Sequence, residues 1–110
     1  MKKILITGIN GFLGKHLLDK LLDNIIFSDI DKIIGIDNFI SSKRKEEYTD
    51  SIKYNFIESD LIKFDFNKLD NFDTVIHLAS LASPFYYKKY PLETIDIGTT
   101  VTRKLLEKCK

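Results

Sequence analysis

The feature that most limits how this chain can fold is a set of three glycines between an apolar segment and an amphipathic one. Residues 3–7 form a short apolar run that predicts a buried strand, and residues 12–22 carry leucines at helical spacing, which predicts a helix. Gly8, Gly11 and Gly14 occupy the turn between the two. A strand, a glycine turn and a helix in this order are typical of a unit that holds a phosphate-bearing ligand at the helix N-terminus.

Each of these glycines has its own expected role. Gly8 permits a tight turn, because only glycine enters positive φ freely. Gly11 lets the backbone approach a pyrophosphate with no Cβ in the way, and Gly14 lets the helix pack closely on the strands. The alternative, that the glycines serve only the turn, stays open because any strand-to-helix connection can use one.

Three more strands are predicted after this unit, at residues 32–36, 53–58 and 72–78, and a last helix at 91–108. Apolar strands that alternate with helices predict an α/β, Rossmann-like fold with a parallel sheet in the order 3-2-1-4, and a ligand at the carboxyl ends of strands one and four. Residues 86–90 are expected to be a loop. The last helix contains β-branched residues and Gly98, which disfavour helix. A helix is still preferred, because five of its residues line up on one face: Leu92, Ile95, Thr99, Thr102 and Leu106.

The bulk properties exclude several classes of partner. Lys and Arg number 17 against 16 Asp and Glu, so a net charge of +1 gives no reason to expect nucleic acid or an anionic membrane as partner. No apolar run approaches the roughly 18 residues that span a bilayer. Cys109 is the only cysteine, which predicts a reducing, cytoplasmic location. The basic run 43–45, followed by two glutamates, is interpreted as a solvated loop.

Asp37 ends the second predicted strand, at about the distance from the glycines that a ribose-binding acid requires. A carboxylate there accepts hydrogen bonds from the adenosine ribose and repels a 2′-phosphate, which favours NAD over NADP. Lys43 and Arg44 argue the other way, since nearby cations can hold a 2′-phosphate.

Two other strand ends carry candidate residues. Asp60 can accept a hydrogen bond from the adenine amino group while Leu61 packs on the ring, although an Asp here is equally typical of a helix N-cap. After the fourth strand, the small Ala79 and Ser80 leave room for the cofactor. His77 is interpreted as a hydrogen-bonded core histidine rather than a base. His16, on the first predicted helix, is interpreted as a structural or a surface residue, and no metal-ligating cluster is expected.

Taken together these marks resemble the extended short-chain dehydrogenase/reductase family, the NAD-dependent epimerases and dehydratases of nucleotide sugars. The segments around Asp37 and from His77 to Pro91 are most similar to its UDP-glucuronate decarboxylases. The resemblance implies that residues 1–110 are the NAD-binding portion, without the substrate domain. It also implies contacts of Ser83, Pro84 and Tyr87 with a UDP-sugar. The residues that it implies face NAD are Gly8, Asn10, Gly11, Phe12, Leu13, Asp37, Asn38, Phe39, Ser42, Asp60, Leu61, Leu78, Ala79 and Ser80.

The chain departs from the family pattern in two places. The family's last helix here carries Asn-x-x-Gly-Thr, where this sequence has Gly98 and Val101 in place of the Asn and Gly. Family catalysis also needs Tyr-x-x-x-Lys, and no tyrosine of this chain has a lysine four positions later. No catalytic residue is therefore predicted, and the chain is expected to be inactive alone. The alternative is a non-catalytic NAD-binding or subunit-interaction module. Self-association is expected through the open edge of the fourth strand.

Overall fold

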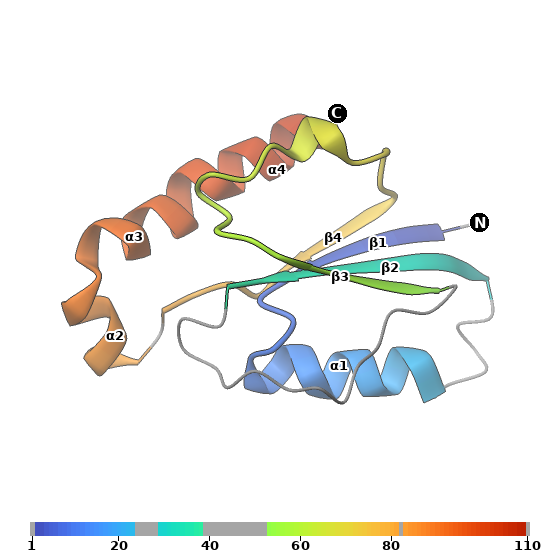
Figure 1. The fold of residues 1–110 in the computed structure, drawn as a ribbon, viewed down its shortest axis with the longest axis horizontal. Helices are drawn as coiled ribbons and strands as arrows, with labels where there is room; N and C mark the ends of the chain where they lie inside the picture. The colour runs from blue at the N-terminus through green and yellow to red at the C-terminus, as the bar shows by residue number, and fades with distance from the viewer. Residues whose placement is uncertain (1, 24–28, 39–52, 82, 110) are drawn as a thin grey trace.

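The structure is a computed structural model that describes residues 2–23, 29–38, 53–81 and 83–109 (Figure 1). It contains a four-stranded sheet and helices on both of its faces. The elements in chain order are β1 (Lys2–Thr7), α1 (Phe12–Asp23), β2 (Ile30–Asp37), β3 (Tyr54–Glu58), the 3₁₀ turn η2 (Phe66–Lys68), β4 (Thr74–His77), α2 (Pro84–Lys89), α3 (Pro91–Asp96), the π-helical turn η3 (Ile97–Val101) and α4 (Thr102–Lys108).

The sheet is parallel, and its strand order β3-β2-β1-β4 is the one that the sequence predicts. Leu5 in the central strand β1 lies between Ile34 of β2 and Val75 of β4. The Rossmann-like α/β fold is therefore confirmed. Strand β4 is shorter than the expected 72–78, since regular pairing with β1 begins at Thr74 and ends at His77.

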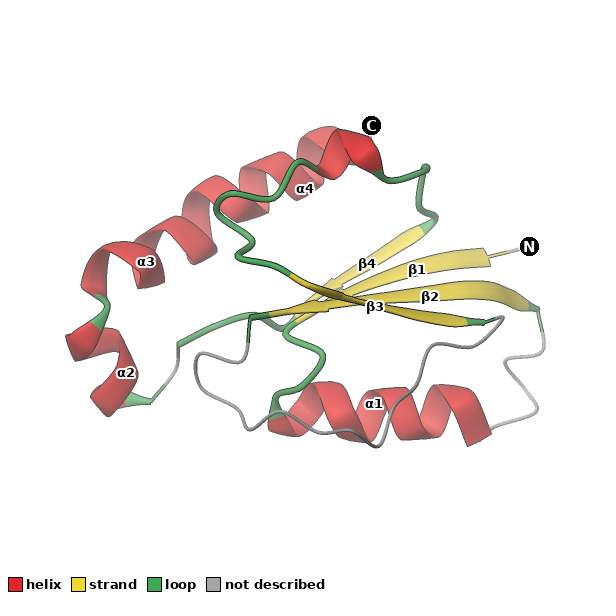
Figure 2. Ribbon diagram, in the orientation of Figure 1, coloured by secondary structure: helices red, strands yellow, loops and turns green. Residues whose placement is uncertain are grey.

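The sheet is the middle of three layers (Figure 2), with α1 on one face and α3, η3 and α4 on the other. Alternate residues of each strand point to opposite faces, so Ile4 and Ile6 pack toward α1 while Leu5 packs toward the last helix. Leu5 and Ile6 are both fully buried. Burial on both faces explains why the strands are apolar throughout rather than alternating, as parallel strands generally are.

Helix α1 buries only part of the apolar stripe that the sequence predicts. Leu18 and Leu21 pack in the core, whereas Phe12 and Leu13 are 78% and 65% exposed. His16 on the same helix is also exposed, and its imidazole ring contacts the ring of Phe12. Of the two interpretations of His16, structural or surface, the structure shows the surface position.

The helical segment from Pro91 to Lys108 is present as predicted, but the sheet buries a different stripe of it. Ile97, Val101 and Leu105 pack on the strands. Leu92 and Ile95, from the face that the sequence favoured, are 71% and 58% exposed. Both stripes are apolar and both have helical spacing, so the periodicity alone could not choose between them. The segment is also not regular, because residues 97–101 form a π-helical turn around Gly98.

Residues 84–89 form helix α2, so the prediction of a loop at 86–90 is wrong. Pro84 occupies the first helical turn, where its missing N–H costs nothing, and Ser83 before it is extended as an N-cap residue is. Two lysines lie in the last turn, which suits the helix dipole. The Lys89 ammonium lies 5.8 Å from the ring centre of Phe85.

None of the described helices is long and apolar enough to cross a membrane.

Candidate functional site

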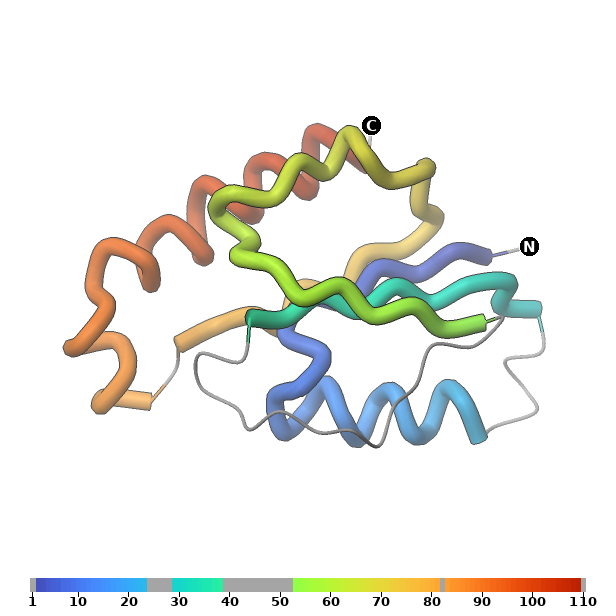
Figure 3. Tube along the Cα trace, in the orientation of Figure 1, coloured from blue at the N-terminus to red at the C-terminus, as the bar shows by residue number. Residues whose placement is uncertain are grey.

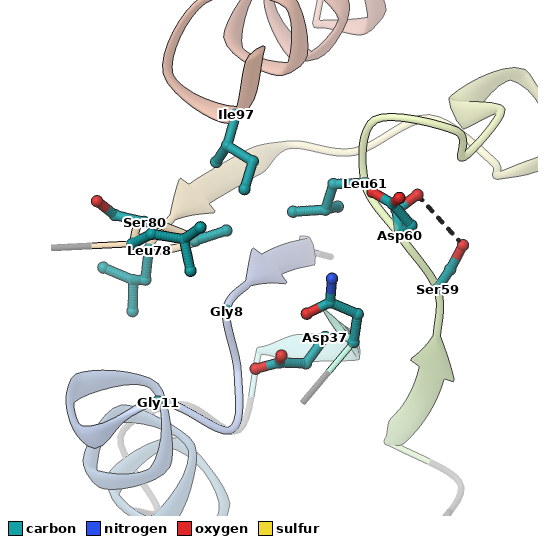
Figure 4. A pocket seen from close by; sticks show the side chains of 12 residues that line it. Gly8, Gly11, Asp37, Ser59, Asp60, Leu61, Leu78, Ser80 and Ile97 are labelled. Carbon is teal, nitrogen blue, oxygen red and sulfur yellow. Dashed lines mark hydrogen bonds between the residues drawn. The ribbon is translucent and has the colours of Figure 1, made fainter. Parts of the chain in front are cut away.

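A pocket lies where the carboxyl ends of all four strands meet (Figure 4). This is the edge at which ligands bind in open α/β sheets. The pocket holds about 510 Å³ of space, part of it open to solvent. Its lining consists of Gly8, Gly11, Asp37, Asn38, Ser59, Asp60, Leu61, Leu78, Ala79, Ser80, Leu81 and Ile97.

The glycine turn forms the floor of this pocket. Gly8 has a φ of 70°, as the sequence predicts, and its N–H donates to the Ile36 carbonyl at 2.9 Å. A Cβ on Gly8 would lie 2.7 Å from the backbone nitrogen of Ala79, so the end of β4 packs directly on the turn. A Cβ on Gly14 would lie 2.6 Å from the Ile9 carbonyl oxygen. The predicted role of Gly8 in the turn is therefore confirmed, whereas Gly14 lets helix α1 approach the backbone of the turn at Gly8 and Ile9 rather than the strands.

Gly11, the remaining glycine of the turn, faces the open side of the pocket. A Cβ on Gly11 would meet only one atom, the Gly8 carbonyl oxygen at 3.3 Å, so its open side is available to a ligand. Helix α1 begins at Phe12, directly beside it, and has no acidic residue in its first turn. The first-turn amides of a helix have no carbonyl partner within the helix, and the helix dipole favours an anion there. This end of the pocket fits a diphosphate group.

The carboxylate of Asp37 stands at the end of β2 and contacts the same turn. Its Oδ2 accepts the backbone N–H of Asn10 at 2.9 Å, and its backbone carbonyl accepts the N–H of Ser59 at 3.1 Å. Asp37 thereby joins β2, the glycine turn and the end of β3. The carboxylate also lines the pocket, close to Gly8, where it can accept hydrogen bonds from a sugar (Figure 4).

Asp60 and Leu61 form the opposite wall, at the end of β3. The Asp60 Oδ1 accepts the N–H of Ile62 at 3.0 Å, so it closes a turn at residues 61–63 rather than capping a helix, which was the alternative from the sequence. Its carboxylate nevertheless lines the pocket, so capping and a contact with a ligand are compatible. Leu61 is 6% exposed and packs in the core beneath this wall.

His77 at the end of β4 is a satisfied histidine, as expected. Its Nδ1 lies 2.5 Å from the Thr7 hydroxyl, and its Nε2 lies 3.1 Å from the Ile97 carbonyl oxygen. A carbonyl only accepts, so Nε2 carries the proton and Nδ1 accepts from Thr7. The Thr7 oxygen in turn accepts the Ala79 N–H at 3.3 Å. The chain of bonds fixes two pocket residues, Ala79 and Ile97.

Some of the predicted site residues lie elsewhere. Asn10 is buried beside Asp37, and the exposed Phe12 and Leu13 stand on α1 outside the lining. The three residues predicted for a sugar nucleotide lie on the exposed cap and helix α2 that follow β4. Phe39 and Ser42 of the cofactor prediction lie outside the described residues, as do Lys43 and Arg44, the two cations that argue for NADP.

The structure adds three residues that sequence reasoning missed: Ser59, Leu81 and Ile97. Ser59 directly follows a predicted strand, so its position in the sequence was a usable signal. Ile97 reaches the pocket from the last helix, pointing toward the strand ends (Figure 4). No local pattern marks it, because its place depends on how that helix packs. Asp37 and Asp60 are the only ionisable side chains among the described lining residues, which suits binding rather than proton transfer.

Comparison with known families places this site. Residues 4–110 match the model of the NAD dependent epimerase/dehydratase family. The chain belongs to this family. NAD is the family's cofactor, and the pocket described above meets its demands: an open glycine turn at a helix N-terminus, a carboxylate at the end of β2 and a wall at the end of β3.

Individual members of this epimerase/dehydratase family are similar over nearly the whole chain. UDP-glucuronic acid decarboxylase 3 of Arabidopsis thaliana is 34% identical over 106 residues, 94% of this chain. Among solved structures, the UDP-N-acetylglucosamine 4-epimerase of Methanobrevibacter ruminantium M1, in complex with UDP-N-acetylmuramic acid, is 32% identical over 98% of the chain, with a TM-score of 0.76. The Bordetella bronchiseptica enzyme WbmH, in complex with NAD⁺, is 28% identical over 98%, with a TM-score of 0.74.

The chain covers only part of these relatives. It spans 29% of the length of the Arabidopsis decarboxylase, 34% of the Methanobrevibacter epimerase and 36% of WbmH. The two residues that replace the Asn and Gly of the family's Asn-x-x-Gly-Thr segment have different surroundings in the structure. Gly98 is exposed, with nothing within 4 Å of an added Cβ, and Val101 is fully buried against the sheet.

Proposed function

We propose that this chain binds NAD in the pocket at the carboxyl ends of its strands. The diphosphate lies on the Gly8–Gly11 turn, the adenosine ribose against Asp37, and the adenine between Asp60 and Leu61. The observation that carries the proposal is the convergence of these groups on one open pocket from three strand ends. Ala79 and Ser80 are small and line the other side, leaving room for the rest of the cofactor.

The carboxylate of Asp37 also supports NAD over NADP. A carboxylate accepts the two ribose hydroxyls, whereas a 2′-phosphate in the same place brings two negative charges together. Asp37 cannot move away easily, because its Oδ2 is held by the Asn10 N–H. We therefore propose tighter binding of NAD than of NADP.

The chain supplies the cofactor-binding part of a nucleotide-sugar enzyme of the UDP-glucuronate decarboxylase type, and has no turnover alone. Bound NAD supplies the hydride acceptor for such a reaction. This chain's residues hold the cofactor, and the exposed Ser83, Pro84 and Tyr87, on helix α2 and its N-cap, contact a UDP-sugar. A cytoplasmic location remains a prediction from the sequence. The second candidate function is a non-catalytic NAD-binding module, favoured by the replacement of the family's Asn and Gly at Gly98 and Val101.

Calorimetric titration of the chain with NAD and NADP tests the proposal, with two glycine variants as a matched pair. Gly11→Ala adds a methyl group where the diphosphate is placed and should weaken NAD binding at least tenfold. Gly98→Ala makes the same chemical change on an exposed helix face, where an added Cβ meets nothing within 4 Å, and should leave NAD affinity unchanged.

Three results bear on the proposal. Saturable NAD binding that is lost in Gly11→Ala alone supports the site. A folded wild-type chain that binds neither dinucleotide contradicts it, as does equal binding by both variants. Incubation with NAD and UDP-glucuronate, followed by chromatography of the nucleotide sugars, tests the claim that the chain is inactive alone: any conversion of the UDP-sugar contradicts that claim.

A further inference from the structure

We propose that Lys104 is a positioning residue for the adenine end of the cofactor pocket. This inference rests on the proposed NAD function. Lys104 lies outside the pocket lining but helps to hold one wall of the pocket in place. The Lys104 ammonium, on helix α4, donates to the Ile62 carbonyl oxygen at 2.8 Å, across 42 residues of sequence. Its side chain is half-buried between the helix and the chain that leaves β3.

Lys104 completes the bonding of a single turn at residues 60–64. The Asp60 carbonyl accepts the N–H groups of Lys63 and Phe64 at 3.1 and 2.9 Å, and its Oδ1 accepts that of Ile62. These bonds use the N–H groups of the turn but leave the Ile62 carbonyl without a donor inside it. Lys104 provides that donor, and a charged donor makes a stronger bond than a neutral one.

The turn carries the two residues proposed to hold adenine. Leu61 packs in the same core as Val101 and Leu105, so its side chain is held by the helix that bears Lys104. The Asp60 Oδ1 is committed to the turn. Among the described residues no donor bonds to the Asp60 Oδ2. This oxygen can therefore accept a hydrogen bond from water or from the amino group of a ligand. Without Lys104 the Ile62 carbonyl loses this charged donor, so the turn that carries the Asp60 carboxylate is held less firmly against the last helix.

The chain contains a matched control for this contact. One helical turn further along α4, the Lys108 ammonium donates to the Leu69 carbonyl oxygen, also at 2.8 Å. Figure 3 shows the connection from β3 to β4 running beside the last helix. Both lysine ammonium groups donate to backbone carbonyls of this connection. Leu69 is not part of the pocket lining, so Lys108 secures the same connection without touching the adenine wall.

The test compares Lys104→Met with Lys108→Met in the full chain, since methionine keeps the apolar stem and removes the donor. Each protein is titrated with NAD and with its deaminated analogue, in which hypoxanthine replaces adenine. The wild-type chain should prefer NAD, because the Asp60 carboxylate accepts from an amino group and repels a carbonyl oxygen. Lys104→Met should lose about tenfold of that preference, while Lys108→Met retains it. Equal preference in both variants, retained or lost, overturns the inference.

A second measurement is independent of cofactor. Amide hydrogen exchange at residues 62–64 should be faster in Lys104→Met than in the wild-type chain, and unchanged in Lys108→Met. Unchanged exchange in Lys104→Met overturns the inference even if NAD binds. If the wild-type chain does not bind NAD but exchange is faster in Lys104→Met, the proposed function and the adenine role are both overturned. The Lys104 contact is then a structural bond only.

Discussion

The carboxylate of Asp37 shows how a single residue serves both the fold and the ligand. One of its oxygens holds the Asn10 N–H and so fixes the glycine turn against β2. The same group lines the pocket at the place proposed for the ribose. An Asn side chain can still accept the Asn10 N–H through its carbonyl oxygen, but it carries no charge. Substitution with Asn therefore separates the structural role from electrostatic selectivity.

Asp37→Asn should weaken NAD binding about tenfold and reduce the preference for NAD over NADP, because the repulsion of a 2′-phosphate disappears. The measurement is parallel calorimetric titration with both dinucleotides. Asp73→Asn is the control, since the Asp73 Oδ2 accepts the Lys3 N–H at 2.8 Å, a similar bond near the opposite end of β1. A preference for NAD that survives Asp37→Asn unchanged would contradict the ribose assignment.

Between elements, a short chain of polar contacts joins β1, β4 and the π-helical turn. Thr7 is fully buried, and its hydroxyl donates to His77 while accepting the Ala79 N–H. His77 extends the chain to the Ile97 carbonyl. Groups buried in this way are costly to leave without partners, so the network contributes to stability mainly through the penalty for breaking it.

Thr7→Val should lower the free energy of unfolding by about 1–3 kcal/mol, because the Ala79 N–H and His77 Nδ1 both lose their partner. Urea unfolding followed by circular dichroism measures this change. Thr99→Val makes the same substitution on an exposed helix face, where the hydroxyl donates to the Ile95 carbonyl, and should change stability by less than about 0.5 kcal/mol. Similar losses in both variants would show that the buried network is not responsible.

The helices contain two glycines for which the same substitution has opposite expected effects. Gly14→Ala in α1 forces a Cβ against the Gly8 and Ile9 carbonyls and should cost about 1–3 kcal/mol. Gly98→Ala meets nothing and should stabilise the last helix by about 0.5–1 kcal/mol, since alanine has the higher helix propensity. Thermal unfolding measures both. A lower Tm for Gly98→Ala would mean that the π-helical turn requires glycine.

For the whole molecule, the open surfaces suggest self-association. Strand β4 is an edge of the sheet, and among the described strands none pairs with its outer side. An uncovered edge is a template for another chain. The last helix offers a second surface, since Leu92, Ile95 and Leu106 are each more than half exposed.

We expect the chain to self-associate through the β4 edge, measured by light scattering across a concentration series. Leu106→Glu places a charge on the exposed helix face and leaves the edge intact, so association should persist in this variant. A monodisperse monomer at all concentrations would contradict self-association. Loss of association in Leu106→Glu alone would assign it to the helix instead of the sheet edge.

Much of the fold could be predicted from local pattern. Short apolar segments between helices indicate parallel strands with right-handed crossovers. The glycine turn then favours the Rossmann-type order 3-2-1-4. The positive φ at Gly8 and the close packing at Gly14 follow from having no Cβ. Helix α2 was missed although Pro84 is a helix-start signal, because the tyrosines and lysines that follow it suggested a loop.

What the sequence determined by itself is therefore the kind of sheet, the glycine turn and the carboxylate at the end of β2, since each depends on a few adjacent residues. Only the tertiary structure decided which apolar stripe of the last helix is buried, and that decision brings Ile97 to the pocket and Lys104 to Ile62. Periodicity describes one helix at a time. Which face is covered depends on where the sheet lies, and that is a property of the whole chain.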